Sequence, residues 1–269
     1  MLRAAGIAFV LMVCSSSIAA EEQADIDPSK PTNLYTNIDS NFELQDHPGD
    51  GDLYGLNIIA AVAFNDFNRL DIELPIHRTA FIESDNKTGL GDIRLRYFWV
   101  GYKKDEARFH AAGVSIDTFF PTGDPDTGHG AGSMLIAPGF TFGFRVAEWL
   151  DLFPVFSYQH SFSEGRRQPG GPDNGGTPLP PGQKPGDEAD TRGVRIEVIS
   201  VVPLPRASWL QLIPMYSRDF ETDAASANLR VQFGIMINPK NAFQVEYQGE
   251  LISERTLQNM IRIAWSYFL

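Results

Sequence analysis

The chain has 269 residues, and 22 basic against 34 acidic side chains give it a formal net charge of −12 at pH 7. Nucleic-acid binding needs a basic face, so this balance argues against a nucleic-acid partner. Cys14 is the only cysteine. An intrachain disulfide framework is therefore excluded, and packing and hydrogen bonds must hold the fold together.

The N-terminal residues 1–20 have the pattern of a secretory signal peptide. Arg3 precedes an apolar stretch that is shorter than the roughly 20 residues of a membrane-spanning helix, and small residues end the segment. The cysteine could instead close a lipidation motif, but Val13 stands where such a motif has a small residue. We therefore expect residues 1–20 to be removed on export, residues 21–32 to form a short periplasmic tail and residues 33–269 to form the folded domain.

Most of the remaining chain alternates apolar and polar residues. Successive side chains of a strand point to opposite sides, so this alternation predicts β-strands with one apolar and one polar face. The pattern is weaker at residues 34–44, 53–64, 109–120, 134–146, 150–162 and 209–217. It is clear at residues 70–77, 93–99, 194–198, 228–237, 243–251 and 260–269. Together these stretches predict about 12 strands, most of them near the roughly 9–11 residues of a tilted membrane-spanning strand.

The connections between these stretches alternate in length along the chain. Shorter connections are expected at residues 65–68, 103–106, 147–148, 203–207 and 238–241. Longer ones are expected at residues 45–52, 83–91, 121–132, 164–190, 220–226 and 252–258. Outer-membrane barrels have short periplasmic turns and longer extracellular loops, whereas a soluble β-sandwich, the alternative fold, has no reason for this asymmetry. We therefore predict an all-β fold, a closed antiparallel up-and-down transmembrane β-barrel in the outer membrane, with both termini on the periplasmic side.

The longest of these connections, residues 164–190, is rich in glycine and proline. Such a composition cannot bury a core of its own. We expect a solvated extracellular loop, with a lid over a binding site as the alternative.

Aromatic residues support the prediction of a membrane barrel. Trp99, Trp149, Trp209 and Trp265 each lie beside a predicted short turn or the C-terminus, where the periplasmic aromatic girdle of a barrel is expected. The apolar alternation runs to the end of the chain and resembles the C-terminal signal of outer-membrane proteins, although Leu269 stands where an aromatic residue is usual. The expected partners are therefore membrane lipid and, through the C-terminal strand, the barrel-assembly machinery.

Sequence motifs for catalysis and cofactor binding are missing. There is no glycine-rich phosphate loop, CxxC pair or HExxH motif, and the five histidines lack metal-ligand spacing, so we expect no cofactor, no metal and no enzyme. Residues 158–166 loosely resemble the HxSNG segment of outer-membrane phospholipase, but Ser161 and Ser163 would point away from His160, whereas a nucleophile and its base must touch. Residues 121–128 place oxygens as a calcium loop does, but they lack its closing glutamate and fit a simple turn.

Two short motifs carry a resemblance to a known family. TGLGD at residues 88–92 and FPTGD at residues 120–124, followed by a glycine-rich run to Gly139, resemble the outer-membrane transporter family of the MetA pathway of phenol degradation. The resemblance spans residues 53–269 and implies an exported barrel that takes up small solutes, with aromatic or hydrophobic compounds among them. It supplies no catalytic residues, and residues 164–190 look like an insertion relative to the family.

Charged residues on the predicted inward faces are the candidate lumen residues. They can line a wetted channel for small solutes, which is the first hypothesis. They can also pair and plug the lumen, which leaves a structural or surface-display barrel. An outer-membrane lipid hydrolase is the third hypothesis. The candidate lumen residues are Asp71, Glu73, Arg94, Arg96, Asp117, Asp151, Arg195, Glu197, Arg230, Glu246, Glu250 and Arg262.

The register of one hairpin can be predicted from its turn. If the turn at residues 238–241 has its midpoint between Pro239 and Lys240, Arg230 lies opposite Gly249. We therefore predict that Arg230 pairs with Glu250 rather than with Glu246.

Overall fold

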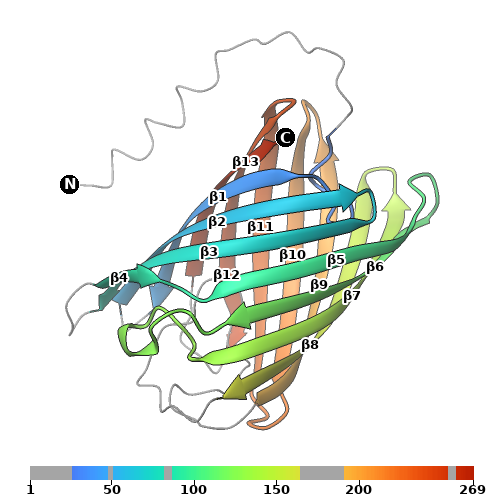
Figure 1. Cartoon of the computed structure of the whole chain (residues 1–269). Coiled ribbons are helices and arrows are strands. Elements are labelled where there is room, and N and C mark those ends of the chain that lie inside the picture. Colours follow the sequence, from blue (N-terminus) through green and yellow to red (C-terminus); the bar gives the residue numbers. More distant parts are fainter. Residues whose placement is uncertain (1–25, 48–50, 82–86, 164–190, 254–258) are drawn as a thin grey trace.

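The computed structural model describes residues 26–47, 51–81, 87–163, 191–253 and 259–269. These residues form one closed antiparallel β-barrel whose strands slant around a common axis (Figure 1). The strands are β1 (Asn37–His47), β2 (Gly51–Asn65), β3 (Asn68–Phe81), β4 (Lys87–Leu90), β5 (Ile93–Lys103), β6 (Phe109–Phe120), β7 (Ser133–Ala147), β8 (Leu150–Ser163), β9 (Thr191–Leu204), β10 (Ser208–Asp219), β11 (Ala225–Asn238), β12 (Asn241–Ser253) and β13 (Asn259–Phe268). The described residues contain no helix that is long and apolar enough to cross a bilayer.

Neighbouring strands in the sequence are neighbours in the barrel, and the pairing of β1 with β13 closes the ring. Thirteen strands are distinguished in the described chain, but β4 and β5 pair with successive parts of β3 and together occupy one strand position in the wall. The barrel is therefore twelve-stranded. Gly91 and Asp92 separate the two halves, and the Gly91 amide donates to the Pro75 carbonyl oxygen at 2.8 Å. The predicted fold is confirmed.

The two ends of the barrel differ in the length of their connections, although less than predicted. Tight turns join strands at one end, where the strand bounds leave only residues 66–67, 104–108, 148–149, 205–207 and 239–240, and β1 begins beside the end of β13. We call this the turn end and the opposite one the loop end. Three of the connections predicted to be longer are not. The strand bounds leave only residues 48–50, 220–224 and 254–258 there, which is no more than residues 104–108 at the turn end. The predicted loop at residues 164–190 lies outside the described residues.

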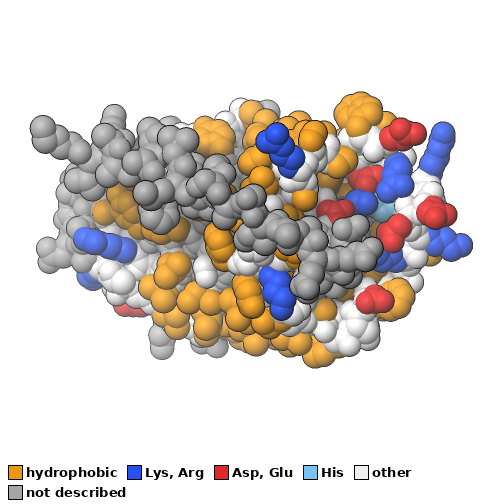
Figure 2. Space-filling model, turned by 90° about the horizontal axis from the view of Figure 1, so that it is seen from above, with side chains coloured by type: hydrophobic (Ala, Val, Ile, Leu, Met, Phe, Trp, Pro, Cys, Tyr) orange, Lys and Arg blue, Asp and Glu red, His pale blue; other side chains and the backbone are white. Residues whose placement is uncertain are grey.

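The outer face of the barrel is an apolar belt. In β13, Ile261, Ile263, Trp265 and Tyr267 are exposed while the residues between them are buried or half-buried. β10 shows the same alternation, and the other strands also carry exposed hydrophobic side chains. Figure 2 shows hydrophobic side chains over the middle of the visible face and charged side chains gathered toward one end. Such a belt is the surface that a barrel presents to lipid.

Three of the four tryptophans lie on this outer face, but Trp209 does not. Trp209 is only 3% exposed and packs inside the barrel at the turn end against Ala242 and Phe268. A Cβ atom on Gly234, which β11 places beside it, would collide with the indole ring. The glycine therefore makes room for an inward tryptophan, and the predicted outward position of Trp209 is wrong.

The predicted register between β11 and β12 is also wrong, by one residue. The turn itself is as expected, with Asn238 opposite Asn241, but a β-bulge between Met236 and Asn238 shifts the pairing beyond it. Arg230 consequently lies opposite Gln248. A bulge inserts an extra residue into one strand only, so counting outward from the turn cannot anticipate it.

Candidate functional site

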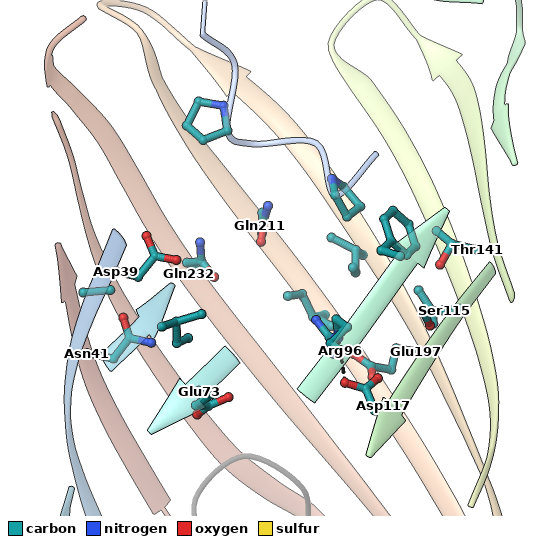
Figure 3. Close-up of a pocket in the computed structure, with 18 of the residues that line it drawn as sticks. Asp39, Asn41, Glu73, Arg96, Ser115, Asp117, Thr141, Glu197, Gln211 and Gln232 are labelled. Carbon is teal, nitrogen blue, oxygen red and sulfur yellow. Dashed lines mark hydrogen bonds and ion pairs between the residues drawn. The ribbon is translucent and has the colours of Figure 1, made fainter. Parts of the chain in front are cut away.

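A cavity of about 420 Å³ occupies the lumen (Figure 3). Every strand except β4 contributes lining residues, because alternate side chains of each strand point inward. Nine of the twelve candidate lumen residues line it. Asp71 and Asp151 are buried beside charged neighbours, and Glu250 lies opposite Asn228 toward the loop end, outside the lining. The nine lining residues are Glu73, Arg94, Arg96, Asp117, Arg195, Glu197, Arg230, Glu246 and Arg262.

One group of charges, the Asp117 cluster, spans β3, β5 and β6. Arg94 Nη1 lies 3.2 Å from Glu73 Oε2, and its Nη2 lies 2.6 Å from Asp117 Oδ1. Arg96 Nε lies 2.7 Å from the same Asp117 oxygen, a contact drawn dashed in Figure 3. Glu73 is directly opposite Arg94, and Arg96 directly opposite Asp117, in the sheet. Strand register therefore builds this cluster.

A second group, the Arg262 cluster, spans β1, β11, β12 and β13. Arg262 lies between two carboxylates, with Nη2 3.0 Å from Glu43 Oε2 and Nη1 3.2 Å from Glu246 Oε1. Arg230 Nε lies 3.4 Å from the same Glu246 oxygen. The predicted Arg230–Glu250 pair is therefore wrong. Arg230 lies opposite Gln248, with Glu246 and Glu250 each two positions away, and it is Glu246 that its side chain approaches.

Glu43 was missing from the sequence-based candidates although its side chain is fully buried in the Arg262 cluster. A signal for it exists in the sequence. Asn41, Glu43 and Gln45 alternate with the apolar Phe42 and Leu44, and the structure places the three polar residues inside. The short polar run looked weak beside the longer stretches near the C-terminus.

A third charged group is a single ion pair on β9. Arg195 Nε donates to Glu197 Oε1 at 2.8 Å, and its Nη2 lies 3.4 Å from the Met215 sulfur. Arg195 is also within electrostatic range of Arg94 and Arg230 on other strands. The cavity is therefore narrow enough for charges on different walls to influence one another.

The lining of the cavity is basic, in contrast to the acidic chain as a whole. Among the described residues, seven basic and five acidic side chains line it. The acidic set is Asp39, Glu73, Asp117, Glu197 and Glu246, and the basic set is Lys30, Arg69, Arg94, Arg96, Arg195, Arg230 and Arg262. Three of these cations also meet carboxylates just behind the lining: Arg262 meets Glu43, Arg69 meets Asp71 and Lys30 meets Asp151. With these partners included, the wall carries no net positive charge, and any preference for anions depends on individual cations that lack close partners.

The segment before β1, residues 26–36, lies against the lumen at the turn end. The Ser29 carbonyl accepts a hydrogen bond from Gln211 Nε2 at 2.6 Å, and Lys30 Nζ lies 3.3 Å from Asp151 Oδ2. Leu34 packs against the inward Phe98. The described part of the stretch expected as a periplasmic tail thus contributes to the cavity wall and narrows the lumen at this end.

The connection between β6 and β7, residues 121–132, is fastened to the barrel wall at the loop end. The Asp92 carboxylate accepts from the Gly123 amide at 2.9 Å and from the Ala131 amide at 2.6 Å. His129 is 2% exposed, and burial lowers the pKa of its imidazole. Asp92 thus ties two backbone amides of this connection to the barrel wall. No cluster of metal-ligating side chains occurs within the described ranges.

Within the described part of the segment that resembles the phospholipase, Ser161 and His160 do not form a nucleophile–base pair. Ser161 points inward and donates to Ser133 Oγ at 3.0 Å. His160 lies on the other face, where its ring contacts Phe162 edge-on at 4.1 Å between centroids. A hydrolase of this type needs the two groups in contact, so the geometry lends no support to the lipid-hydrolase hypothesis.

Several solved outer-membrane proteins are similar to this chain. The COG4313 outer membrane channel from Pseudomonas putida F1 matches with a TM-score of 0.66 and 12% identity, over 92% of this chain and 100% of its own. The NanC porin matches with a TM-score of 0.61 and 10% identity over 86% and 100%. The KdgM porin, solved in complex with disordered oligogalacturonate, matches with a TM-score of 0.56 and 10% identity over 87% and 99%.

At these identities the likeness shows a shared fold, the outer-membrane β-barrel, which agrees with the apolar belt described above. No protein-family model and no curated protein matches the sequence. Membership of the phenol-degradation transporter family therefore stays a prediction.

Proposed function

We propose that the protein is an outer-membrane channel for small solutes and that the cavity is the middle of its passage. The cavity itself is the observation that carries this proposal. A barrel plugged by its own salt bridges would fill its lumen, whereas about 420 Å³ remains among the side chains here. That volume lies within the roughly 300–1,000 Å³ of sites that hold small molecules.

The solute class implied by the family resemblance is aromatic or hydrophobic. Apolar side chains between the charged clusters support it, since Phe119, Ile199 and Ile213 all line the cavity. Charged walls with apolar patches suit a molecule that has both a polar group and an apolar body. Passage at the turn end requires the segment at residues 26–36 to shift, because that segment forms part of the wall there.

A structural barrel with a closed lumen is the second candidate. The paired charges of the Asp117 and Arg262 clusters favour it, because each guanidinium there already meets a carboxylate. Its surface-display version depends on residues 164–190, which lie outside the described residues.

Recording from planar lipid bilayers separates the two candidates. Residues 21–269 are refolded, and folding is confirmed by β-sheet circular dichroism and by the heat-dependent gel mobility of barrels. A channel gives discrete openings whose conductance rises with salt concentration. Folded protein that inserts without any openings would contradict the channel and support the closed barrel.

A further inference from the structure

The charged wall of the cavity contains guanidiniums of two kinds. Arg94 and Arg262 direct their donors at carboxylates from three nitrogens each. Their partners sit in fixed positions on neighbouring strands, so these two arginines hold the wall together. Arg195 and Arg230 have much poorer partners.

Arg195 satisfies one nitrogen with Glu197 and directs a second at the Met215 sulfur, which is a weak acceptor. Arg230 makes a long hydrogen bond of 3.4 Å to Gln248 Oε1. Its Nε is buried and has no hydrogen-bond partner within the described chain, since Glu246 stands off at 3.4 Å. Buried N–H groups without partners are costly, and an oxyanion would satisfy them.

The positions of the two arginines also favour an anion between them. Both side chains line the same cavity, on β9 and β11, and their charges repel each other. Between these strands lies β10, whose Ile213 is directly opposite Arg230 and nearly buried. An anion that bound both guanidiniums would relieve the repulsion and supply acceptors for their N–H groups.

Resting on the proposed channel function, we infer that Arg195 and Arg230 form a binding subsite for the carboxylate of a small aromatic acid. The carboxylate accepts from the free N–H groups of both guanidiniums, because the fork of N–H donors on arginine matches a planar carboxylate. The apolar body of the solute lies against Ile213 and Ile199, which line the cavity beside them. The inference thus narrows the proposed aromatic or hydrophobic solutes to those that carry a negative charge.

Equilibrium dialysis of radiolabelled benzoate against the refolded barrel in detergent micelles tests this subsite without ion flow. Benzyl alcohol has the same ring without the charge, and inorganic phosphate has the charge without the ring. We expect saturable binding of benzoate, about tenfold weaker binding in Arg195→Gln and in Arg230→Gln, and weaker competition by phosphate than by unlabelled benzoate. Benzyl alcohol should compete least of the three.

Matched variants control for folding and for net charge. Arg218→Gln removes a cation from the exposed rim, where Arg218 pairs with Asp223, and should leave benzoate binding unchanged. Arg195→Gln combined with Glu197→Gln removes a pair without altering net charge, so it keeps the protein testable if the single variant fails to fold, and it should still weaken binding.

Three outcomes would overturn the subsite: benzoate that does not saturate, benzyl alcohol that competes as well as benzoate, or Arg218→Gln that lowers binding as much as Arg230→Gln. Stronger competition by phosphate than by benzoate would assign the arginines to inorganic anions and would also overturn it. The channel proposal is tested separately, by the bilayer recordings. Saturable benzoate binding by a barrel that shows no openings in bilayers contradicts the channel alone, whereas openings without benzoate binding contradict the subsite alone.

Discussion

Replacement of Arg262 by glutamine should destabilise the barrel by about 3–5 kcal/mol, the usual effect of removing one partner from a buried ion pair. Arg262 is the only cation within salt-bridge distance of Glu43 in the described chain apart from His77, whose Nε2 is 3.9 Å away. It also holds Glu246 at 3.2 Å. Glu43 is fully buried, so water cannot replace the lost charge there, whereas Glu246 lines the cavity and keeps Arg230 at 3.4 Å.

The free energy of unfolding can be measured by denaturant titration of the protein in lipid vesicles, with tryptophan fluorescence as the signal. The double variant Arg262→Gln with Glu43→Gln removes cation and anion together, so it should recover most of the loss. Arg218→Gln at the exposed rim should change stability by less than about 1 kcal/mol. A loss below about 1 kcal/mol for Arg262→Gln, or no recovery in the double variant, would refute the assignment of Arg262 as the charge that holds this wall together.

Three further predictions follow from the faces and contacts of the strands. Phe233→Lys should lower the free energy of unfolding by about 2–4 kcal/mol because Phe233 faces lipid, whereas Gln232→Lys, which faces the cavity, should cost under about 1 kcal/mol; equal losses would contradict the face assignment. Lys30→Ala removes the ion pair with Asp151 and should raise single-channel conductance if residues 26–36 narrow the lumen, so an unchanged conductance would count against that role. Glu246→Gln should shift the reversal potential in a salt gradient toward anions, and Glu250→Gln, outside the cavity lining, should shift it less; the opposite order would mean that the wrong carboxylate lines the passage.

Much of the barrel can be predicted from the sequence, because the side of the sheet to which a side chain points is set locally within each strand. Alternation alone predicted that Ile261, Ile263 and Trp265 point outward and that Arg262 points inward, and the exposed fractions agree. Alternating lengths of the connections predicted which end carries the tight turns. Even the weak polar alternation around Glu43 indicates that this side chain points inward, although the run is short.

Two placements were not predicted: one because position beside a turn is a weaker guide than strand parity, the other because it depends on packing. Trp209 fits a girdle by its place beside a turn, yet the parity of β10 points it inward and Gly234 leaves it room there. The segment before β1 has no strand pattern, and its place inside the barrel depends on Gln211 and Asp151, which are far away in the sequence.

The sequence by itself determined that the chain is an outer-membrane barrel with a charged interior, because alternation and turn composition act over a few residues. Only the tertiary structure decided which charges meet. A single bulge near Met236 placed Arg230 opposite Gln248, and its side chain approaches Glu246 rather than Glu250. Closure of the ring between β1 and β13 brought Glu43 to Arg262 across 219 residues. Register and closure depend on the whole sheet at once, so the size of the cavity and the unused donors of Arg195 and Arg230 emerge only when every strand is in place.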